Sequence, residues 1–185
     1  MIPYTESAYR KNKFAFVSDY ARYWILYNFG GIYFDTDVEV IRPFNDIIKR
    51  GPFLGIEKDR DLISINPGLG MGANRNMDFY KRMIDFYRRL IVDENNAVLP
   101  YLVNKTTRFL VEKGFVDEDK EQIVDGITIY PNDFFNPLND YDGRLHITEN
   151  TRSVHYYAKS WIEAYGPLRN YIVRKFHYLK SSLIR

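Results

Sequence analysis

The chain has 185 residues, of which 45% are hydrophobic, 17% aromatic and 27% charged; 26 Lys and Arg residues against 24 Asp and Glu residues give a net charge of +2. This composition is typical of a folded globular domain and excludes collagen-like, disordered and low-complexity chains. The charge is too small to indicate a nucleic-acid-binding protein. Because cysteine is absent, disulfide frameworks, thiolate zinc sites and cysteine nucleophiles are excluded.

The first helix is expected over residues 15–31, AFVSDYARYWILYNFGG. Ser18 can cap its start, which places Asp19 in the first turn, and Gly30 with Gly31 can end it. Side chains recur at helical spacing along one face, which comprises Val17, Tyr20, Ala21, Trp24 and Tyr27 or Asn28.

Short strands and helices alternate along the rest of the chain. We expect strands at 32–34, 38–41, 53–57 and 123–130 and one or two more within 144–155, with a turn-rich segment at 66–72 and a loop at 131–143. Helices are expected near 44–49, over 77–92 and 97–113 as a helical insert, and over 167–183. This alternation predicts a single α/β layered domain over residues 1–185. The many Tyr and Phe residues suit either a carbohydrate-facing surface or the core, and the core is favoured.

The acidic triplet Asp35-Thr-Asp37 follows the apolar run Ile-Tyr-Phe. If the chain is extended there, both carboxylates leave the same side of the backbone. Two hard oxygen donors at the end of a buried strand can hold Mg²⁺ or Mn²⁺ and leave coordination positions for phosphate oxygens. Three other D-x-D triplets, at 59–61, 117–119 and 140–142, do not follow an apolar strand, so we interpret them as solvated turns.

Two rival acidic motifs fit the same triplet less well. A calcium-binding EF-hand loop from Asp35 requires Gly and Glu where the sequence has Val40 and Asp46. A phosphatase of the haloacid dehalogenase type would use Asp35 as nucleophile and Asp37 as acid/base, but its fifth motif position is Glu39 here. The phosphatase stays open as a less favoured alternative.

Asp19 and Arg22 lie at i and i+3 on the preceding helix. They form either an ion pair on the helix or part of a sugar site. In a sugar site, Asp19 would accept hydrogen bonds from sugar hydroxyls, and the guanidinium of Arg22 would donate to hydroxyl or phosphate oxygens. The arrangement SDYAR, helix, GGIYFDTDVEV resembles the DXD-containing sugar transferases of glycosyltransferase family 32. The resemblance covers residues 14–161 and is strongest over 14–44, at INPGLGMGA (65–73) and at 147–161, which ends in HYYAKSW.

The resemblance implies a GT-A fold, a Rossmann-like nucleotide-diphospho-sugar transferase domain, with transfer that retains anomeric configuration. It implies that a UDP- or GDP-sugar donates a hexose to a glycan or lipid-linked acceptor in capsule, lipopolysaccharide or other polysaccharide biosynthesis, with Mn²⁺ or Mg²⁺. By matching positions, Asp19, Arg22 and Asn66 would hold the donor sugar. Asp35, Asp37 and His155 would bind the metal, with Asp35 also contacting ribose or sugar, and Ser160 and Trp161 would meet the outer phosphate.

The family's first strand, which begins with Ile-Pro and forms part of the nucleotide pocket, is represented here only by Met1-Ile-Pro. We therefore expect an N-terminally shortened domain, and a noncatalytic sugar-nucleotide or glycan-binding relative remains an alternative. No secretory signal and no run of 18 apolar residues is present, which favours the cytoplasm. The basic helix over 167–183 could touch an anionic membrane, but a solvated helix packed on the domain is favoured.

Overall fold

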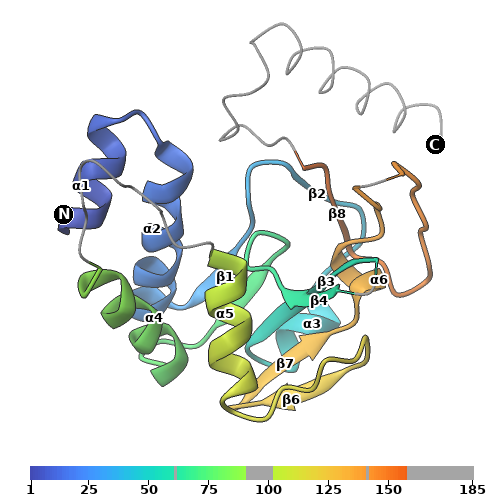
Figure 1. Cartoon of the computed structure of the whole chain (residues 1–185). Coiled ribbons are helices and arrows are strands. Elements are labelled where there is room, and N and C mark those ends of the chain that lie inside the picture. The colour runs from blue at the N-terminus through green and yellow to red at the C-terminus, as the bar shows by residue number, and fades with distance from the viewer. Residues whose placement is uncertain (61, 91–101, 141, 158–185) are drawn as a thin grey trace, which may run out of the picture.

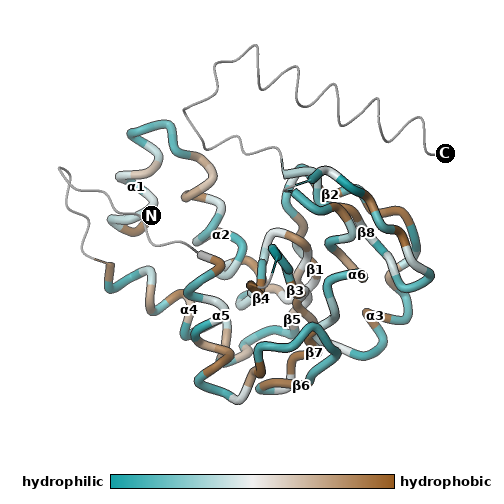
Figure 2. Tube along the Cα trace, turned by 45° about the vertical axis from the view of Figure 1, so that its right-hand side comes forward, coloured by the Kyte–Doolittle hydropathy of each residue, from teal (hydrophilic) through white to brown (hydrophobic). Residues whose placement is uncertain are grey.

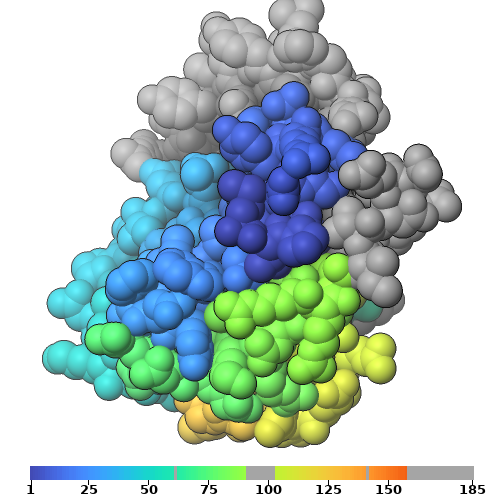
Figure 3. Space-filling view, turned by 90° about the vertical axis from the view of Figure 1, so that its left-hand side faces the viewer, coloured from blue at the N-terminus to red at the C-terminus, as the bar shows by residue number. Residues whose placement is uncertain are grey.

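The computed structural model describes residues 1–60, 62–90, 102–140 and 142–157 (Figure 1). A mixed β-sheet lies at its centre, with helices α1, α2 and α4 gathered at one end and a small second sheet at the other (Figure 1). Seen from the helical end, α1 and α2 pack against α4 in one continuous surface (Figure 3). The helix expected over 167–183 lies outside the described residues.

The N-terminal residues form a helix that the sequence analysis did not anticipate. Helix α1 (Pro3–Arg10) has its proline at the first turn, where a missing N–H costs nothing. The chain then turns through Asn12, which has a positive φ of 55°, into helix α2 (Phe14–Phe29). Tyr4 and Ala8 of α1 are buried, so α1 extends the core.

Helix α2 is confirmed, but its predicted cap is wrong. Of the face predicted from helical spacing, Tyr20 and Tyr27 pack against the core, whereas Trp24 does not. It begins at Phe14 with Lys13 at the N-cap position, and the Ser18 hydroxyl lies inside the helix and donates to the carbonyl of Ala15 at 2.6 Å. Asp19 is therefore not in the first turn. The buried residues are Arg22, Tyr23 and Leu26, whereas Trp24 is 40% exposed.

The physical reason is that α2 packs between other helices. The Tyr23 ring lies 6.0 Å from that of Tyr80 and 6.4 Å from that of Tyr87, both on α4 (Asp78–Arg88). This tertiary contact selects a face of α2 that its own periodicity does not single out, because apolar residues occur all round the helix.

The large sheet has the strand order β1–β5–β3–β7–β6, and β4 also pairs with β3. The strands are β1 (Gly31–Tyr33), β3 (Phe53–Asp59), β4 (Leu62–Ile65), β5 (Met71–Ala73), β6 (Gln122–Val124) and β7 (Ile127–Tyr130). Strands β3 and β7 are parallel, with Leu54 opposite Ile129, and the other pairs are antiparallel. The mixed α/β architecture agrees with the predicted fold class and is compatible with a GT-A-like fold.

Strand β1 was expected to be buried, and this prediction is wrong. It pairs with β5 at the edge of the sheet, and Gly31 and Ile32 are exposed. The cause is strand β5, which lies between β1 and the central β3. The sequence pattern predicts a turn-rich segment, not a strand, at the start of β5.

The strand expected over 123–130 is a hairpin. Strands β6 and β7 are joined by Asp125 and Gly126, both of which have positive φ, 53° and 76°. Asp-Gly is a favoured two-residue hairpin turn, so this signal was present in the sequence. The loop expected over 131–143 likewise contains one short helix, α6 (Asn132–Phe135).

The second sheet confirms the predicted strands near residues 38–41 and 144–155. It pairs β2 (Val38–Val40) antiparallel with β8 (Ser153–His155), so that Val38 lies opposite His155. Figure 1 shows the chain passing from β1 in the large sheet to β2 in the small one. The acidic triplet lies in this connection.

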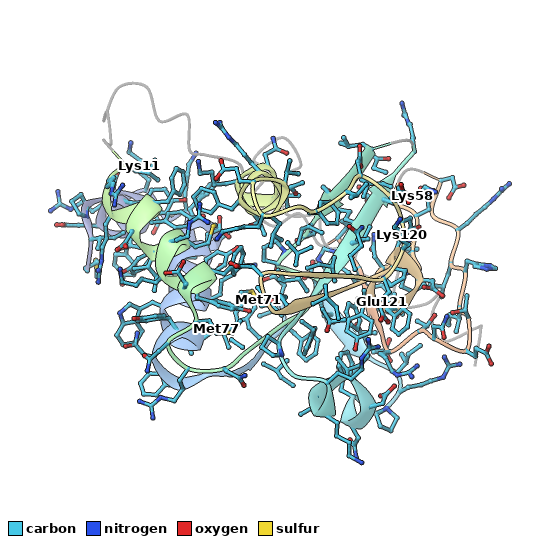
Figure 4. The ribbon with its side chains drawn as sticks, turned by 90° about the horizontal axis from the view of Figure 1, so that it is seen from below. Lys11, Lys58, Met71, Met77, Lys120 and Glu121 are labelled. Carbon is cyan, nitrogen blue, oxygen red and sulfur yellow. The ribbon has the colours of Figure 1, made fainter. Side chains whose placement is uncertain are left out.

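The remaining helices agree with their predictions. Helix α3 (Asn45–Lys49) precedes β3, and α4 and α5 (Leu102–Val111) fall within the two ranges expected to be helical. Hydrophobic segments of the trace meet along β5 and β7 (Figure 2). Seen from below, Met71 lies centrally, between Lys11 at the helical end and Lys58, Lys120 and Glu121 at the opposite end (Figure 4). Within the described residues, no helix is both long and apolar enough to cross a bilayer.

The aromatic residues that were expected to fill the core do so in large part, with Tyr4, Tyr23, Tyr80, Tyr87, Tyr130, Phe53 and Phe135 among the largest fully buried side chains. Close packing leaves no room at certain backbone positions. At Gly72 of β5, an added Cβ would overlap the ring of Phe53.

We expect Gly72→Ala to lower the free energy of unfolding by about 1–3 kcal/mol, because the new methyl group displaces Phe53 in a packed core. Urea titration followed by circular dichroism measures this. Val116→Ala, at a loop residue that is 48% exposed, is the control and should stay within about 0.5 kcal/mol of the parent. Equal stability of the two variants would contradict the packing at Gly72.

Candidate metal and sugar site

The acidic triplet lies in the connection between β1 and β2, where the chain turns at residues 36 and 37, so the extended geometry considered for the two carboxylates does not apply. The N–H of Asp35 donates to the Gly68 carbonyl at 3.1 Å, and the Asp35 carbonyl accepts from the N–H of Val38 at 3.1 Å. The turn, rather than the alternation of a strand, therefore sets the directions of Asp35 and Asp37.

His155 reaches the triplet through the pairing of β8 with β2. Its Nε2 lies 3.2 Å from Oδ1 of Asp37, and the N–H of Tyr156 donates to the Asp37 carbonyl at 2.9 Å. One ligand atom each from Asp35, Asp37 and His155 lies within 4.8 Å of the others. The predicted triad is thus together in space, although His155 is far from the two aspartates in the sequence.

The donor set fits a divalent cation of the predicted kind. Carboxylate oxygens suit Mg²⁺ and Mn²⁺, and imidazole nitrogen favours a transition metal such as Mn²⁺. Two cis ligands of an octahedral ion at about 2.1 Å lie about 3.0 Å apart, close to the separation of His155 and Asp37. The other ring nitrogen, Nδ1, is buried, and no hydrogen-bond partner for it occurs among the described residues.

Arg22 lies beside the triplet as a buried cation, 4% exposed. Its Nη2 is 3.0 Å from Oδ1 of Asp19 and 3.1 Å from Oδ1 of Asp35, and its guanidinium carbon lies 4.7 Å from the centre of the Tyr33 ring. The Tyr33 hydroxyl also donates to Oδ1 of Asp35, at 2.7 Å. The ion pair expected between Asp19 and Arg22 is present, and it extends to the acidic triplet.

The two carboxylates that face Arg22 differ in their surroundings. Burial raises the pKa of Asp19 to about 6, against the opposing effect of Arg22, and the nearby charge of Asp35 raises it further. Asp19 is therefore protonated more readily than an ordinary aspartate. The predicted sugar contacts of Asp19 and Arg22 remain predictions.

Asn66 lies in a turn that packs against Asp35. Its Oδ1 accepts from the N–H of Gly68 at 2.8 Å, and its Nδ2 donates to Oε2 of Glu57 at 3.1 Å. An added Cβ at Gly68 would overlap the Asp35 carboxylate. The turn thus brings Asn66 close to the triplet, while its predicted sugar contact remains a prediction.

Two residues near the site were missed by the sequence analysis, Glu57 and Tyr157. The Tyr157 hydroxyl lies 2.8 Å from Oε1 of Glu57, and the Tyr157 backbone has a positive φ of 48°. A carboxylate at the end of the apolar run FLGIE was the available signal for Glu57. Ser160 and Trp161 lie outside the described residues, so their predicted phosphate contacts stay predictions.

Comparison with known families gives one match. Residues 2–54 match the family model of the glycosyltransferase sugar-binding region containing the DXD motif. No curated protein and no solved structure matches the chain. The matched residues contain Asp19, Arg22, Asp35 and Asp37. The match supports a glycosyltransferase family, a DXD motif and nucleotide-sugar binding, while the narrower assignment to family 32 remains a prediction.

The raised pKa of Asp19 predicts a pH-dependent stability. Asp19 binds its proton more tightly in the folded state than in the unfolded chain. Its contribution to the free energy of unfolding therefore falls as the pH rises from about 4 to about 6, and it is constant at higher pH. Asp19→Asn cannot titrate at this position. Between pH 4 and pH 7, we therefore expect the free energy of unfolding of the variant to rise relative to that of the parent by up to about 3 kcal/mol.

Urea unfolding at a series of pH values measures this difference. Glu6→Gln, at an exposed residue paired with Arg10, is the control and should follow the parent within about 0.5 kcal/mol. If Asp19→Asn runs parallel to the parent over this range, the description of Asp19 as a carboxyl destabilised by burial is wrong.

Proposed function

We propose that this chain is a metal-dependent, retaining glycosyltransferase of the GT-A fold that moves a hexose from a UDP- or GDP-sugar to a glycan or lipid-linked acceptor. The observation that carries the proposal is the convergence of Asp35, Asp37 and His155 at a turn inside the region that matches the DXD family model. A sheet with a parallel β3–β7 pair and helices packed at one end is compatible with such a fold.

In this proposal Asp35, Asp37 and His155 hold Mn²⁺ or Mg²⁺, with Asp37 and His155 presenting neighbouring donor atoms 3.2 Å apart. The bound cation would supply positive charge to the nucleotide diphosphate as it leaves. Breaking the sugar–phosphate bond makes the phosphate more anionic, so groups that stabilise this charge accelerate the reaction.

The other residues orient the substrate. Arg22 pairs with Asp35 and with Asp19, which restrains the conformation of the acidic turn. Asp19 accepts hydrogen bonds from sugar hydroxyls, and Asn66 offers the amide hydrogen that Glu57 does not use. Ser160 and Trp161 donate hydrogen bonds to the outer phosphate of the sugar nucleotide. The hexose is transferred to an acceptor of polysaccharide biosynthesis.

The noncatalytic alternative is favoured by one observation. Arg22 is 4% exposed and its charge is already balanced by two carboxylates, so it presents little free surface to a ligand. A chain of this kind could bind a sugar nucleotide or a glycan without transfer.

We expect Asp37→Ala to lower hydrolysis of UDP-glucose, UDP-galactose or GDP-mannose in the presence of Mn²⁺ by about 100-fold or more, because the diphosphate loses its main electrostatic partner. Released nucleotide diphosphate gives the rate, and the electron paramagnetic resonance signal of free Mn²⁺ gives the metal affinity. Circular dichroism should show the fold unchanged.

Asp117→Ala is the matched control, since Asp117 is an exposed acidic residue of another D-x-D triplet. It should retain the activity and Mn²⁺ affinity of the parent. A fully active Asp37→Ala protein would refute the metal assignment. Metal-independent glycan binding by a parent that turns over no donor would favour the noncatalytic alternative.

A further inference from the structure

A partly buried polar cluster connects the turn that packs against Asp35 to the segment that follows His155. It consists of Glu57, Asn66, Asn136 and Tyr157, and Glu57 on β3 lies at its centre. The Glu57 carboxyl contacts the Asn66 amide through Oε2 and the Tyr157 hydroxyl through Oε1. A single side chain therefore bridges the turn at residues 66–68 and the segment after β8.

On one side the cluster leads to Asp35. The Asn66 amide is held between Glu57 and the N–H of Gly68, and the Gly68 carbonyl accepts from the N–H of Asp35. Gly68 is also packed directly against the Asp35 carboxylate. A displacement of Asn66 would therefore move both the backbone and the side chain of Asp35.

On the other side the cluster leads to His155. The Tyr157 ring lies 4.3 Å from the imidazole of His155, in an edge-on arrangement. The positive φ of Tyr157 costs roughly 1–3 kcal/mol for a residue with a side chain. The hydroxyl contacts of Tyr157 with Glu57 and Asn136, both 2.8 Å long, oppose that cost and fix the ring.

The orientation of each amide in the cluster follows from backbone N–H groups, which are donors only. The N–H of Lys58 donates to Oδ1 of Asn132, so Asn136 must present Nδ2 to that oxygen and Oδ1 to Tyr157. In the same way, the N–H of Gly68 donates to Oδ1 of Asn66, so Nδ2 faces Glu57.

The Tyr157 hydroxyl donates toward Oε1 of Glu57 and toward Oδ1 of Asn136, both 2.8 Å away, and Oε2 of Glu57 accepts from Asn66. Both carboxyl oxygens of Glu57 are therefore held by hydrogen bonds. Burial raises the pKa of Glu57 and Asp140 raises it further, while Tyr157, His155 and Asn66 lower it.

We propose that Glu57, through its hydrogen bonds to Asn66 and Tyr157, is a positioning residue that holds Asp35 and His155 in the geometry required to bind the metal. It acts through Asn66 and Gly68 toward Asp35 and through Tyr157 toward His155. The inference rests on the proposed metal site. Residues that orient metal ligands typically change metal affinity by 10–100-fold when they are removed.

The test measures Mn²⁺ affinity of the full chain without nucleotide sugar, from the electron paramagnetic resonance signal of free Mn²⁺, at a temperature well below the melting transition of every variant. We expect Glu57→Ala and Tyr157→Phe to weaken binding by about 10–100-fold. Glu57→Gln should bind like the parent, because its amide oxygen accepts from Asn66 and its NH₂ group donates to Tyr157.

Tyr156→Phe is the matched control. It also removes one tyrosine hydroxyl next to His155, but that hydroxyl donates to Glu39 at 2.6 Å and not to Glu57. It should leave the Mn²⁺ affinity unchanged. Melting temperatures recorded in parallel separate a general loss of stability from a loss of metal affinity, and Tyr157→Phe tests the proposal if Glu57→Ala fails to fold.

Unchanged affinity in both Glu57→Ala and Tyr157→Phe, with a parent that binds Mn²⁺, would overturn the role of Glu57 and leave the proposed function intact. A loss in Glu57→Gln as large as in Glu57→Ala would show that hydrogen bonding at this position is not sufficient, and would overturn the proposal that Glu57 acts through its hydrogen bonds. A parent without Mn²⁺ affinity would instead refute the metal site itself, and the role of Glu57 with it.

Discussion

The buried guanidinium of Arg22 is the constraint on which the candidate site depends. A charge removed from water must be paired, and here two carboxylates from different parts of the chain pair with it, Asp19 on the same helix and Asp35 in the acidic turn. Removing one partner of a buried pair typically costs about 3–5 kcal/mol. The acidic turn is therefore fixed to α2.

The position of the turn also explains how the site draws on both sheets. The chain leaves the edge strand β1, turns at Asp35 and Asp37, and enters β2, which pairs with β8 and so delivers His155. The Asn66 turn, which connects β4 to β5, packs against the same carboxylate. Residues from α2, the acidic turn, the Asn66 turn and β8 thus meet at the site.

The proposed function rests on this meeting of charges rather than on the fold alone. The family match covers Asp19, Arg22, Asp35 and Asp37 but ends at residue 54, so it includes neither His155 nor Glu57. His155 is connected to the triplet by strand pairing, and Glu57 by the partly buried polar cluster. Metal binding and donor turnover are therefore the measurements that distinguish a transferase from a binding protein.

The sequence by itself determined the α/β class, the positions of α2, α3, α4 and α5, and the strands β2, β3 and β8, and it pointed to Asp35, Asp37 and His155 as candidate metal ligands. These predictions rest on local periodicity, on the acidic triplet after an apolar run, and on a resemblance that linked His155 to it. The edge position of β1, the buried face of α2 and the role of Ser18 were decided only by tertiary structure. Packing against α4 and pairing with β5 outweighed local propensity there. Glu57 was not predicted from the sequence, because its partners Asn66 and Tyr157 become its neighbours only in the folded structure.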